Sequence, residues 1–147
     1  HVTGDRIKNF NWYPDYSILM CVPPETFDTA NANLHFERRS KPYLDNLLNL
    51  LEEAARDRNS RSFSEISTES ARLNQRYRFS GIFSLLEKQL VALGTEGACI
   101  AHTGTVVGLL FGGADAATKA RLAAGPVARL LPHQVRLQIT KLSAGLR

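Results

Sequence analysis

A glycine-bearing segment in the second half of the chain has residue types whose spacing suggests chemistry. Gly97, Gly104 and Gly108 fall within twelve residues, in and beside two short β-type runs. Glycine weakens a strand interior and often marks the close approach of a ligand or another backbone. Thr103 and Thr105 flank Gly104, so their hydroxyls and nearby backbone N–H groups could bind an anion. The alternative is a tight hairpin within a packed sheet.

His102 adjoins this turn, and its imidazole could act as an acid or base or hydrogen-bond a substrate. A single histidine at a strand end is more often structural. The other histidines have no metal-ligand spacing relative to it. The sequence contains no G-x-x-x-x-G-K-[ST], G-x-G-x-x-G or G-x-S-x-G pattern, so these phosphate-loop, dinucleotide and serine-hydrolase motifs give no support.

A second candidate site is the polar loop that follows the first apolar run. Asp28 and Thr29 lie in it and offer a carboxylate and a hydroxyl to a small polar substrate. The alternative is an ordinary loop in which both side chains cap local turns.

The elements that must position these residues follow from the apolar spacing. Residues 16–22 predict a buried strand, which Pro23-Pro24 ends. Residues 1–14 predict an initial extended strand or linker. A polar loop at 23–40 leads to the helices.

Three helices are predicted next. Leucines at helical spacing predict one over 41–56, with Ser40 as its cap. A second is expected to begin at Ser62, which has capping-box spacing to Glu65. Its expected inner face consists of Phe63, Ile66, Ser70, Leu73 and Tyr77. A third is expected to follow Ser80 and to stop at Gly94.

The last third of the chain returns to strands. A hairpin is predicted over 97–111, then a helix capped by Asp115 and kinked or restarted at Gly125-Pro126. Alternation over 135–142 predicts a strand with Val135, Leu137 and Ile139 toward the core. The order predicts an α+β fold of the ferredoxin-like split β-α-β type. It would have a four-stranded antiparallel sheet with helices on one face.

Composition excludes several classes of protein and of site. The chain has 147 residues, 44% of them hydrophobic, and no apolar run as long as the roughly 18–20 residues of a membrane helix. Two cysteines, Cys21 and Cys99, exclude a disulfide scaffold and a four-cysteine zinc site within this chain. They are interpreted as reduced core residues. No secretion signal is present, so a cytoplasmic location is expected.

The basic charge is concentrated at one end of the sequence. Residues 1–114 carry a net charge of −1, whereas residues 115–147 carry +5. The basic residues there have no aromatic residues among them, unlike most single-strand binders. A solvated surface is therefore favoured over a nucleic-acid site.

The hairpin segment also resembles a known family. Residues 101–108, Ala-His-Thr-Gly-Thr-Val-Val-Gly, resemble the C-terminal glycine-bearing motif of the GHMP small-molecule kinases. Within that superfamily the motif is most similar to that of the L-threonine kinases of cobalamin synthesis and propanediol utilisation. Asp28-Thr29 resembles an Asp-Thr segment of the same family.

The resemblance implies half of a kinase. Residues 15–147 would form the C-terminal domain that closes the active-site cleft, and residues 1–14 would lead from a missing N-terminal half. That half would be the partner and would bind most of the ATP and Mg²⁺. The residues implied to contact substrate or phosphate are His102, Thr103, Gly104, Thr105, Gly108, Asp28 and Thr29. The small-molecule substrate would be L-threonine, and the isolated chain would be inactive. The chain begins at His1 rather than Met, which allows a fragment or a processed protein.

Two other functions stay open at this stage. One is a non-enzymatic amino-acid-binding α+β module. The other is an RNA-binding domain that uses the basic end, which the absence of strand aromatics of the RNA-recognition type disfavours.

Overall fold

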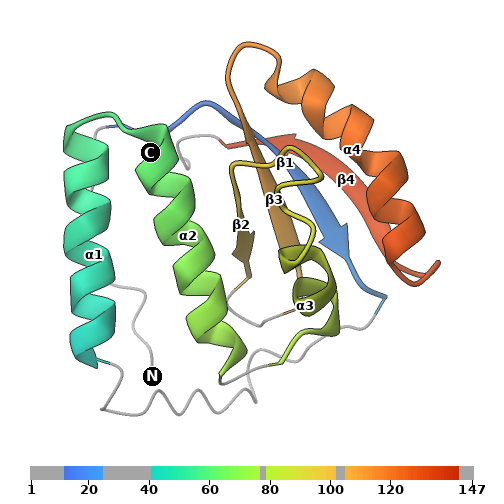
Figure 1. Ribbon diagram of the computed structural model, residues 1–147, viewed down its shortest axis with the longest axis horizontal. Coiled ribbons are helices and arrows are strands. Elements are labelled where there is room, and N and C mark those ends of the chain that lie inside the picture. The colour runs from blue at the N-terminus through green and yellow to red at the C-terminus, as the bar shows by residue number, and fades with distance from the viewer. Residues whose placement is uncertain (1–11, 25–40, 77–78, 102–104, 143–147) are drawn as a thin grey trace.

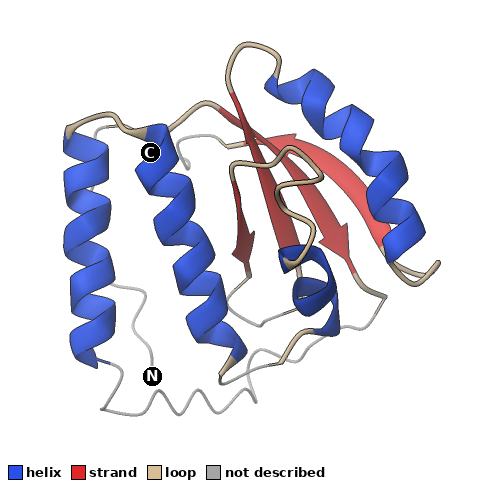
Figure 2. Ribbon diagram, viewed as in Figure 1, coloured by secondary structure: helices blue, strands red, loops and turns tan. Residues whose placement is uncertain are grey.

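The computed structural model describes residues 12–24, 41–76, 79–101 and 105–142. The elements, in chain order, are β1 (Tyr16–Val22), α1 (Lys41–Arg56), α2 (Ser60–Gln75), α3 (Gly81–Glu87), β2 (Gly97–Ile100), β3 (Val107–Gly112), α4 (Ala116–Leu130) and β4 (Arg136–Lys141). Figures 1 and 2 show their arrangement. The expected strand within residues 1–14 lies mostly outside the described residues, and the expected cap Ser40 lies wholly outside them.

The four strands form one antiparallel sheet in the order β2-β3-β1-β4. β1 pairs on one side with β3, in the register Leu19↔Leu109, and on the other with β4, in the register Leu19↔Ile139. β1 and β2 are therefore parallel with β3 between them, and β3 and β4 are parallel with β1 between them. These are two split β-α-β units. The predicted α+β class and four-stranded antiparallel sheet are confirmed.

One face of the sheet holds the main hydrophobic core. Residues that alternate along the two central strands point to this face, because side chains directly opposite in an antiparallel pair share a face. The fully buried members are Leu19, Cys21, Val107, Leu109 and Phe111. Phe83 and Leu86 of α3 and four small residues of α4 complete this core: Ala116, Ala120, Ala123 and Val127. Small side chains let α4 lie close to the strands.

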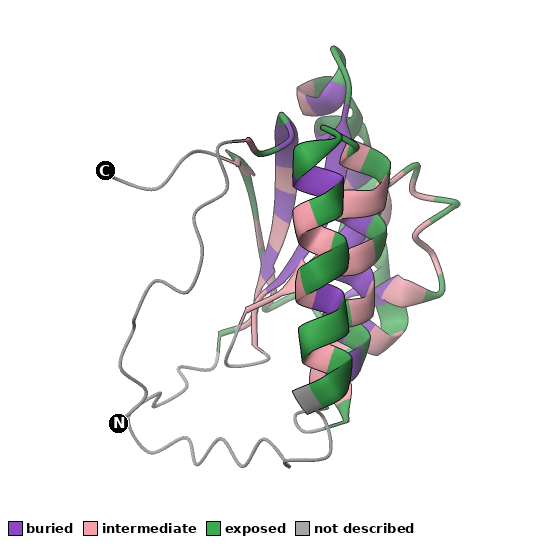
Figure 3. Ribbon diagram, turned by 90° about the vertical axis from the view of Figure 1, so that its left-hand side faces the viewer, coloured by how far each residue is buried: buried purple, intermediate pink, exposed green. Residues whose placement is uncertain are grey.

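The other helices lie toward the β2 edge. α2 runs beside β2, and α1 packs on α2 farther out, whereas α4 crosses β1, β3 and β4 (Figure 1). Figure 3 shows that the outer surface of α1 is largely exposed. Gly97 lets α2 approach closely, since a Cβ there would lie 2.6 Å from the carbonyl oxygen of Ser64. α2 therefore covers an edge strand that would otherwise be open.

The predicted start of the second helix was wrong. α2 begins at Ser60, and the N-cap is Asn59, whose side chain accepts a hydrogen bond from the Ser62 N–H at 3.1 Å. Glu65 instead pairs with Arg61 at 3.0 Å. Asparagine is among the strongest N-cap residues, so it overrides the capping box. The buried residues of α2 are Ser64, Thr68, Ala71 and Leu73. Of the predicted inner face, Leu73 is therefore confirmed, whereas Phe63 and Ile66 are only partly buried, Ser70 is exposed and Tyr77 lies outside the described residues.

The other two helices also differ from expectation at their ends. α3 stops at Glu87, and turns occupy most of the next seven residues up to Gly94, which has a φ of +67°. α4 continues through Pro126 to Leu130, so the helix does not restart there, which was one of the two expected outcomes. Gly125 allows this because it has no Cβ to meet the proline ring. Asp115 makes no capping hydrogen bond and pairs with Lys119 at 2.9 Å.

β4 follows the predicted alternation only in part. Its register places Leu137 and Ile139 on the core face, opposite Cys21 and Leu19. Ile139 nevertheless stays 38% exposed, because β4 is an edge strand with a neighbour on one side only. The interior is thus centred on β1 and β3.

Candidate functional site

A cleft of about 400 Å³ opens at one end of the sheet. It lies where β1 ends, where the β2–β3 hairpin turns, where α3 begins and where the chain leads into β4. The lining residues from these four places are Pro23, Pro24, Phe79, Ser80, Gly81, Ile82, Leu85, Thr105, Pro132, Gln134 and Val135. The cleft therefore gathers segments that are far apart in the sequence.

Local capping fixes the α3 wall of this cleft. The Ser80 hydroxyl accepts a hydrogen bond from the Phe83 N–H at 3.3 Å, which makes Ser80 the N-cap of α3. The Ser80 N–H donates to Oε1 of Gln75 at 2.8 Å, which ties the start of α3 to the end of α2. Ile82 can then face the cleft while Phe83 enters the core.

The hairpin brings one predicted site residue to the cleft. β2 and β3 pair in the register Cys99↔Gly108, and the Ala101 N–H donates to the Val106 carbonyl oxygen at 2.8 Å. This bond extends the hairpin, as predicted, and leaves Thr105 on the cleft wall. His102, Thr103 and Gly104 lie outside the described residues. Asp28 and Thr29 also do, although Pro23 and Pro24, which lead toward them, line the cleft.

Gly108 occupies a different environment from Thr105. It is buried within β3 and is not among the residues that line the cleft. A Cβ at this position would lie 2.7 Å from Sγ of Cys99 and 2.8 Å from Cγ2 of Ile18. Packing within the sheet accounts for this glycine, and any contact with a ligand stays a prediction.

The described lining of the cleft is uncharged. Aliphatic, proline and aromatic side chains predominate, and Ser80, Thr105 and Gln134 supply the polar ones. Two large apolar residues at its border are well exposed, Phe79 at 80% and Leu85 at 50%. Within the described ranges, no group of three or more His, Cys, Asp or Glu side chains could hold a metal ion.

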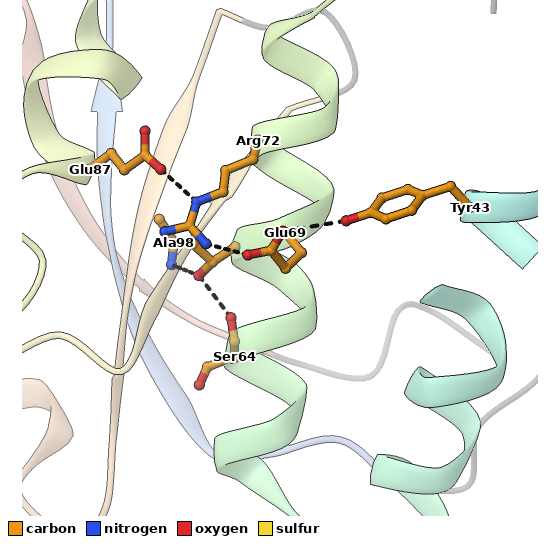
Figure 4. A network of polar contacts seen from close by, with 7 residues as sticks. Tyr43, Ser64, Glu69, Arg72, Glu87 and Ala98 are labelled. Carbon is orange, nitrogen blue, oxygen red and sulfur yellow. Dashed lines mark hydrogen bonds and ion pairs between the residues drawn. The ribbon is translucent and has the colours of Figure 1, made fainter. Parts of the chain in front are cut away.

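A chain of polar contacts links α1, α2 and α3 (Figure 4). Nε of Arg72 contacts Oε1 of Glu87 at 2.5 Å, and the same guanidinium pairs with Glu69. The Tyr43 hydroxyl donates to Glu69 at 3.3 Å. Glu87 is the main cause of the raised pKa of Arg72. Sequence reasoning missed this network, because only the Glu69–Arg72 spacing is visible along the chain.

The prediction of free thiols is confirmed for both cysteines, whereas a position in the core is confirmed for Cys21 alone. Both are free thiols, and Cys21 is fully buried. Burial raises the pKa of Cys21 to about 12 and also raises that of Cys99. Cys99 borders a second cavity of about 340 Å³ between α1, α2 and β2, which is walled mostly by apolar side chains. A thiol kept protonated is a poor nucleophile, so neither cysteine has the character of a catalytic group.

The basic side chains of the last third are spread over exposed positions on α4 and β4. None of Lys119, Arg121, Arg129, Arg136 and Lys141 lines the cleft. This placement agrees with a solvated surface. No helix in the described part of the chain combines the length and the apolar character that a membrane crossing requires.

Comparisons with solved structures find the same fold in two kinases. The chain superposes on L. major mevalonate kinase, solved with R-mevalonate, with a TM-score of 0.70 and 12% identity over 95% of this chain. It superposes on homoserine kinase from Cytophaga hutchinsonii with a TM-score of 0.59 and 11% identity over 88% of this chain. It spans only 46% and 43% of those chains. At this identity the likeness shows the fold.

Comparisons at the level of sequence give no further assignment. No protein-family model matches the sequence, and no curated protein matches it significantly.

Proposed function

We propose that the chain is the C-terminal half of an ATP-dependent small-molecule kinase of the GHMP type. The observation that carries the proposal is the coincidence of two independent features. The fold is shared with parts of two small-molecule kinases. The described ends of the family-like segment 101–108 join the paired strands β2 and β3, and its Thr105 borders the cleft. The reaction would transfer the γ-phosphoryl group of ATP to an alcohol hydroxyl.

The residues present suggest which half of the kinase would bind ATP and Mg²⁺ and which would contact the acceptor. Phosphoryl transfer depends mainly on positioning and charge stabilisation. The described residues offer no carboxylate cluster for Mg²⁺. ATP and Mg²⁺ would therefore be held mainly by an N-terminal half with its own phosphate loop. This chain would contribute the turn His102–Thr105, with its hydroxyls and backbone N–H groups, and the wall of the cleft.

For the acceptor we propose L-threonine, phosphorylated for cobalamin synthesis. The support is the resemblance of residues 101–108, together with Asp28 and Thr29, to the L-threonine kinases. Asp28 could pair with the ammonium group of the amino acid, and Thr29 could hydrogen-bond its polar end. Gly108 would act indirectly, by allowing β2 and β3 to hold the turn.

A kinase assay tests this proposal. The isolated chain should release no ADP from ATP with L-threonine, since it lacks a phosphate loop. The chain joined to, or mixed with, a half that carries a GHMP phosphate loop should release ADP under the same conditions. Thr105→Val should lower kcat/KM about tenfold or more if the hydroxyl contacts the transferred group or the acceptor.

The control is Leu122→Ser, at an exposed position on α4 outside the cleft. This variant should keep full activity. Strong activity from the isolated chain would exclude the two-half mechanism. Binding of L-threonine to the isolated chain in calorimetry, combined with no phosphorylation in the joined form, would favour the amino-acid-binding module instead.

A further inference from the structure

The cleft beside Thr105 has the wrong chemistry for the charged parts of a kinase reaction. Ile82, Leu85 and Val135 form much of its wall, and no described charged side chain lines it. Burial of a phosphate, carboxylate or ammonium group against such a wall is costly without a partner charge. The described wall therefore offers no partner for the charged ends of ATP or of the acceptor.

The size of the cleft suits an apolar molecular fragment. Its volume of about 400 Å³ falls in the range of small-molecule pockets, which are mostly apolar with a few placed polar groups. Thr105 and Gln134 supply such polar groups on two sides. Exposed Phe79 and Leu85 extend the apolar surface to the mouth.

We infer that this cleft binds the uncharged aliphatic part of the phosphate acceptor, with the acceptor's hydroxyl toward Thr105. The role of the ligand as a phosphate acceptor rests on the proposed kinase function, whereas the affinity of the cleft for aliphatic alcohols does not. The described wall thus favours the aliphatic part of the acceptor over its ionised groups.

Nuclear magnetic resonance titration of the whole 147-residue chain tests this inference without ATP. Isoamyl alcohol, a neutral branched alcohol, should shift the backbone amide signals of Ile82, Thr105 and Gln134. Inorganic phosphate should leave the same signals in place. The inference is wrong if the alcohol does not shift them, or if phosphate shifts them as strongly as the alcohol does.

Two variants sharpen the test. Leu85→Asp places a charge at the half-exposed mouth and should raise the dissociation constant for isoamyl alcohol about tenfold. Ile82→Val removes one methylene from the wall and should also weaken binding, by roughly tenfold, with little risk to folding. The control, Leu122→Asp, adds the same charge at a 73% exposed position on α4 and should leave the affinity unchanged. Equal affinities for all four proteins would overturn the inference.

The outcome separates this inference from the kinase proposal. If the alcohol binds with this variant pattern but the joined protein transfers no phosphate, only the kinase proposal fails. If the joined protein is active on L-threonine while the alcohol never reaches the cleft, only this inference fails.

Discussion

At the scale of single residues, Gly108 shows how little space the sheet leaves between its strands. A methyl group at this position would lie within 2.8 Å of both the Cys99 sulfur and a methyl of Ile18. Both contacts are with side-chain atoms of residues on the strands that flank β3, so an added methyl group would force these side chains to shift. The glycine is therefore needed for packing, whatever the hairpin binds.

We predict that Gly108→Ala lowers the free energy of unfolding by about 1–3 kcal/mol, the usual cost of overpacking. Urea denaturation followed by circular dichroism measures this change. Gly81→Ala is the matched control, since a Cβ there meets nothing within 4 Å and alanine favours the helix. If both variants are equally stable, the contacts with Cys99 and Ile18 do not restrict position 108.

The glycine spacing indicated that another group lies close to the backbone at these positions, but not whether that group is a ligand or part of the protein. At both Gly97 and Gly108, another group lies within 3 Å of the point where an alanine methyl would stand, and in both cases that group belongs to the protein. Sequence alone cannot separate this from ligand contact, because both demand a missing side chain. Of the predicted site residues, only Thr105 is described on the cleft wall.

At the scale of elements, a buried hydroxyl joins α2 to the sheet. Oγ1 of Thr68 accepts a hydrogen bond from the Ala98 N–H at 2.9 Å and donates to the Ser64 carbonyl oxygen at 2.9 Å. Ala98 lies in an edge strand, so this N–H has no partner strand on that side. Thr68 therefore replaces part of a missing β ladder.

Thr68→Val keeps the shape of the side chain but leaves the Ala98 N–H buried without an acceptor. We expect the free energy of unfolding to fall by about 1–3 kcal/mol, the cost of an unsatisfied buried donor. Hydrogen exchange at Ala98 should become faster. Thr118→Val on the exposed side of α4 is the control and should change little. Unchanged exchange at Ala98 would contradict this role for Thr68.

Local signals predicted the elements well wherever one signal dominated. The apolar run before Pro23-Pro24 gave β1, and leucine spacing gave α1, each with the bounds that the structure has. Where two local signals competed, as between Asn59 and Ser62 as caps, the prediction was wrong. The Thr68–Ala98 and Arg72–Glu87 contacts join distant segments, so no periodicity could reveal them.

At the scale of the whole molecule, the buried phenol of Tyr16 makes the stability of the fold depend on pH in the alkaline range. Tyr16 is almost fully buried, its hydroxyl donates to the carbonyl oxygen of Ser60, and burial raises its pKa from 10.0 to about 12. Folding therefore favours the protonated phenol. This contribution to stability is complete below pH 10 and is lost as the pH rises from about 10 to 12.

We predict that the free energy of unfolding falls between pH 10 and pH 12, and that it falls less in Tyr16→Phe than in the unmodified protein. Tyr16→Phe is also less stable at neutral pH, because it lacks the hydrogen bond to Ser60. Tyr13→Phe, at a 43% exposed position, should follow the unmodified curve. Identical pH curves for both variants would show that Tyr16 ionises equally in the folded and unfolded chain.

The place of β1 in the centre of the sheet also governs how the chain can acquire its structure during synthesis. Both strands that flank β1 come much later in the sequence, since Ser17 pairs with Phe111 and with Lys141. The apolar strand from Tyr16 to Val22 therefore has no partner until the ribosome has released β3, and it has its second partner only when β4 has followed. Long sequence separation of contacts slows folding. The α1–α2 pair can assemble early, whereas the sheet can close only after β4 has been synthesised.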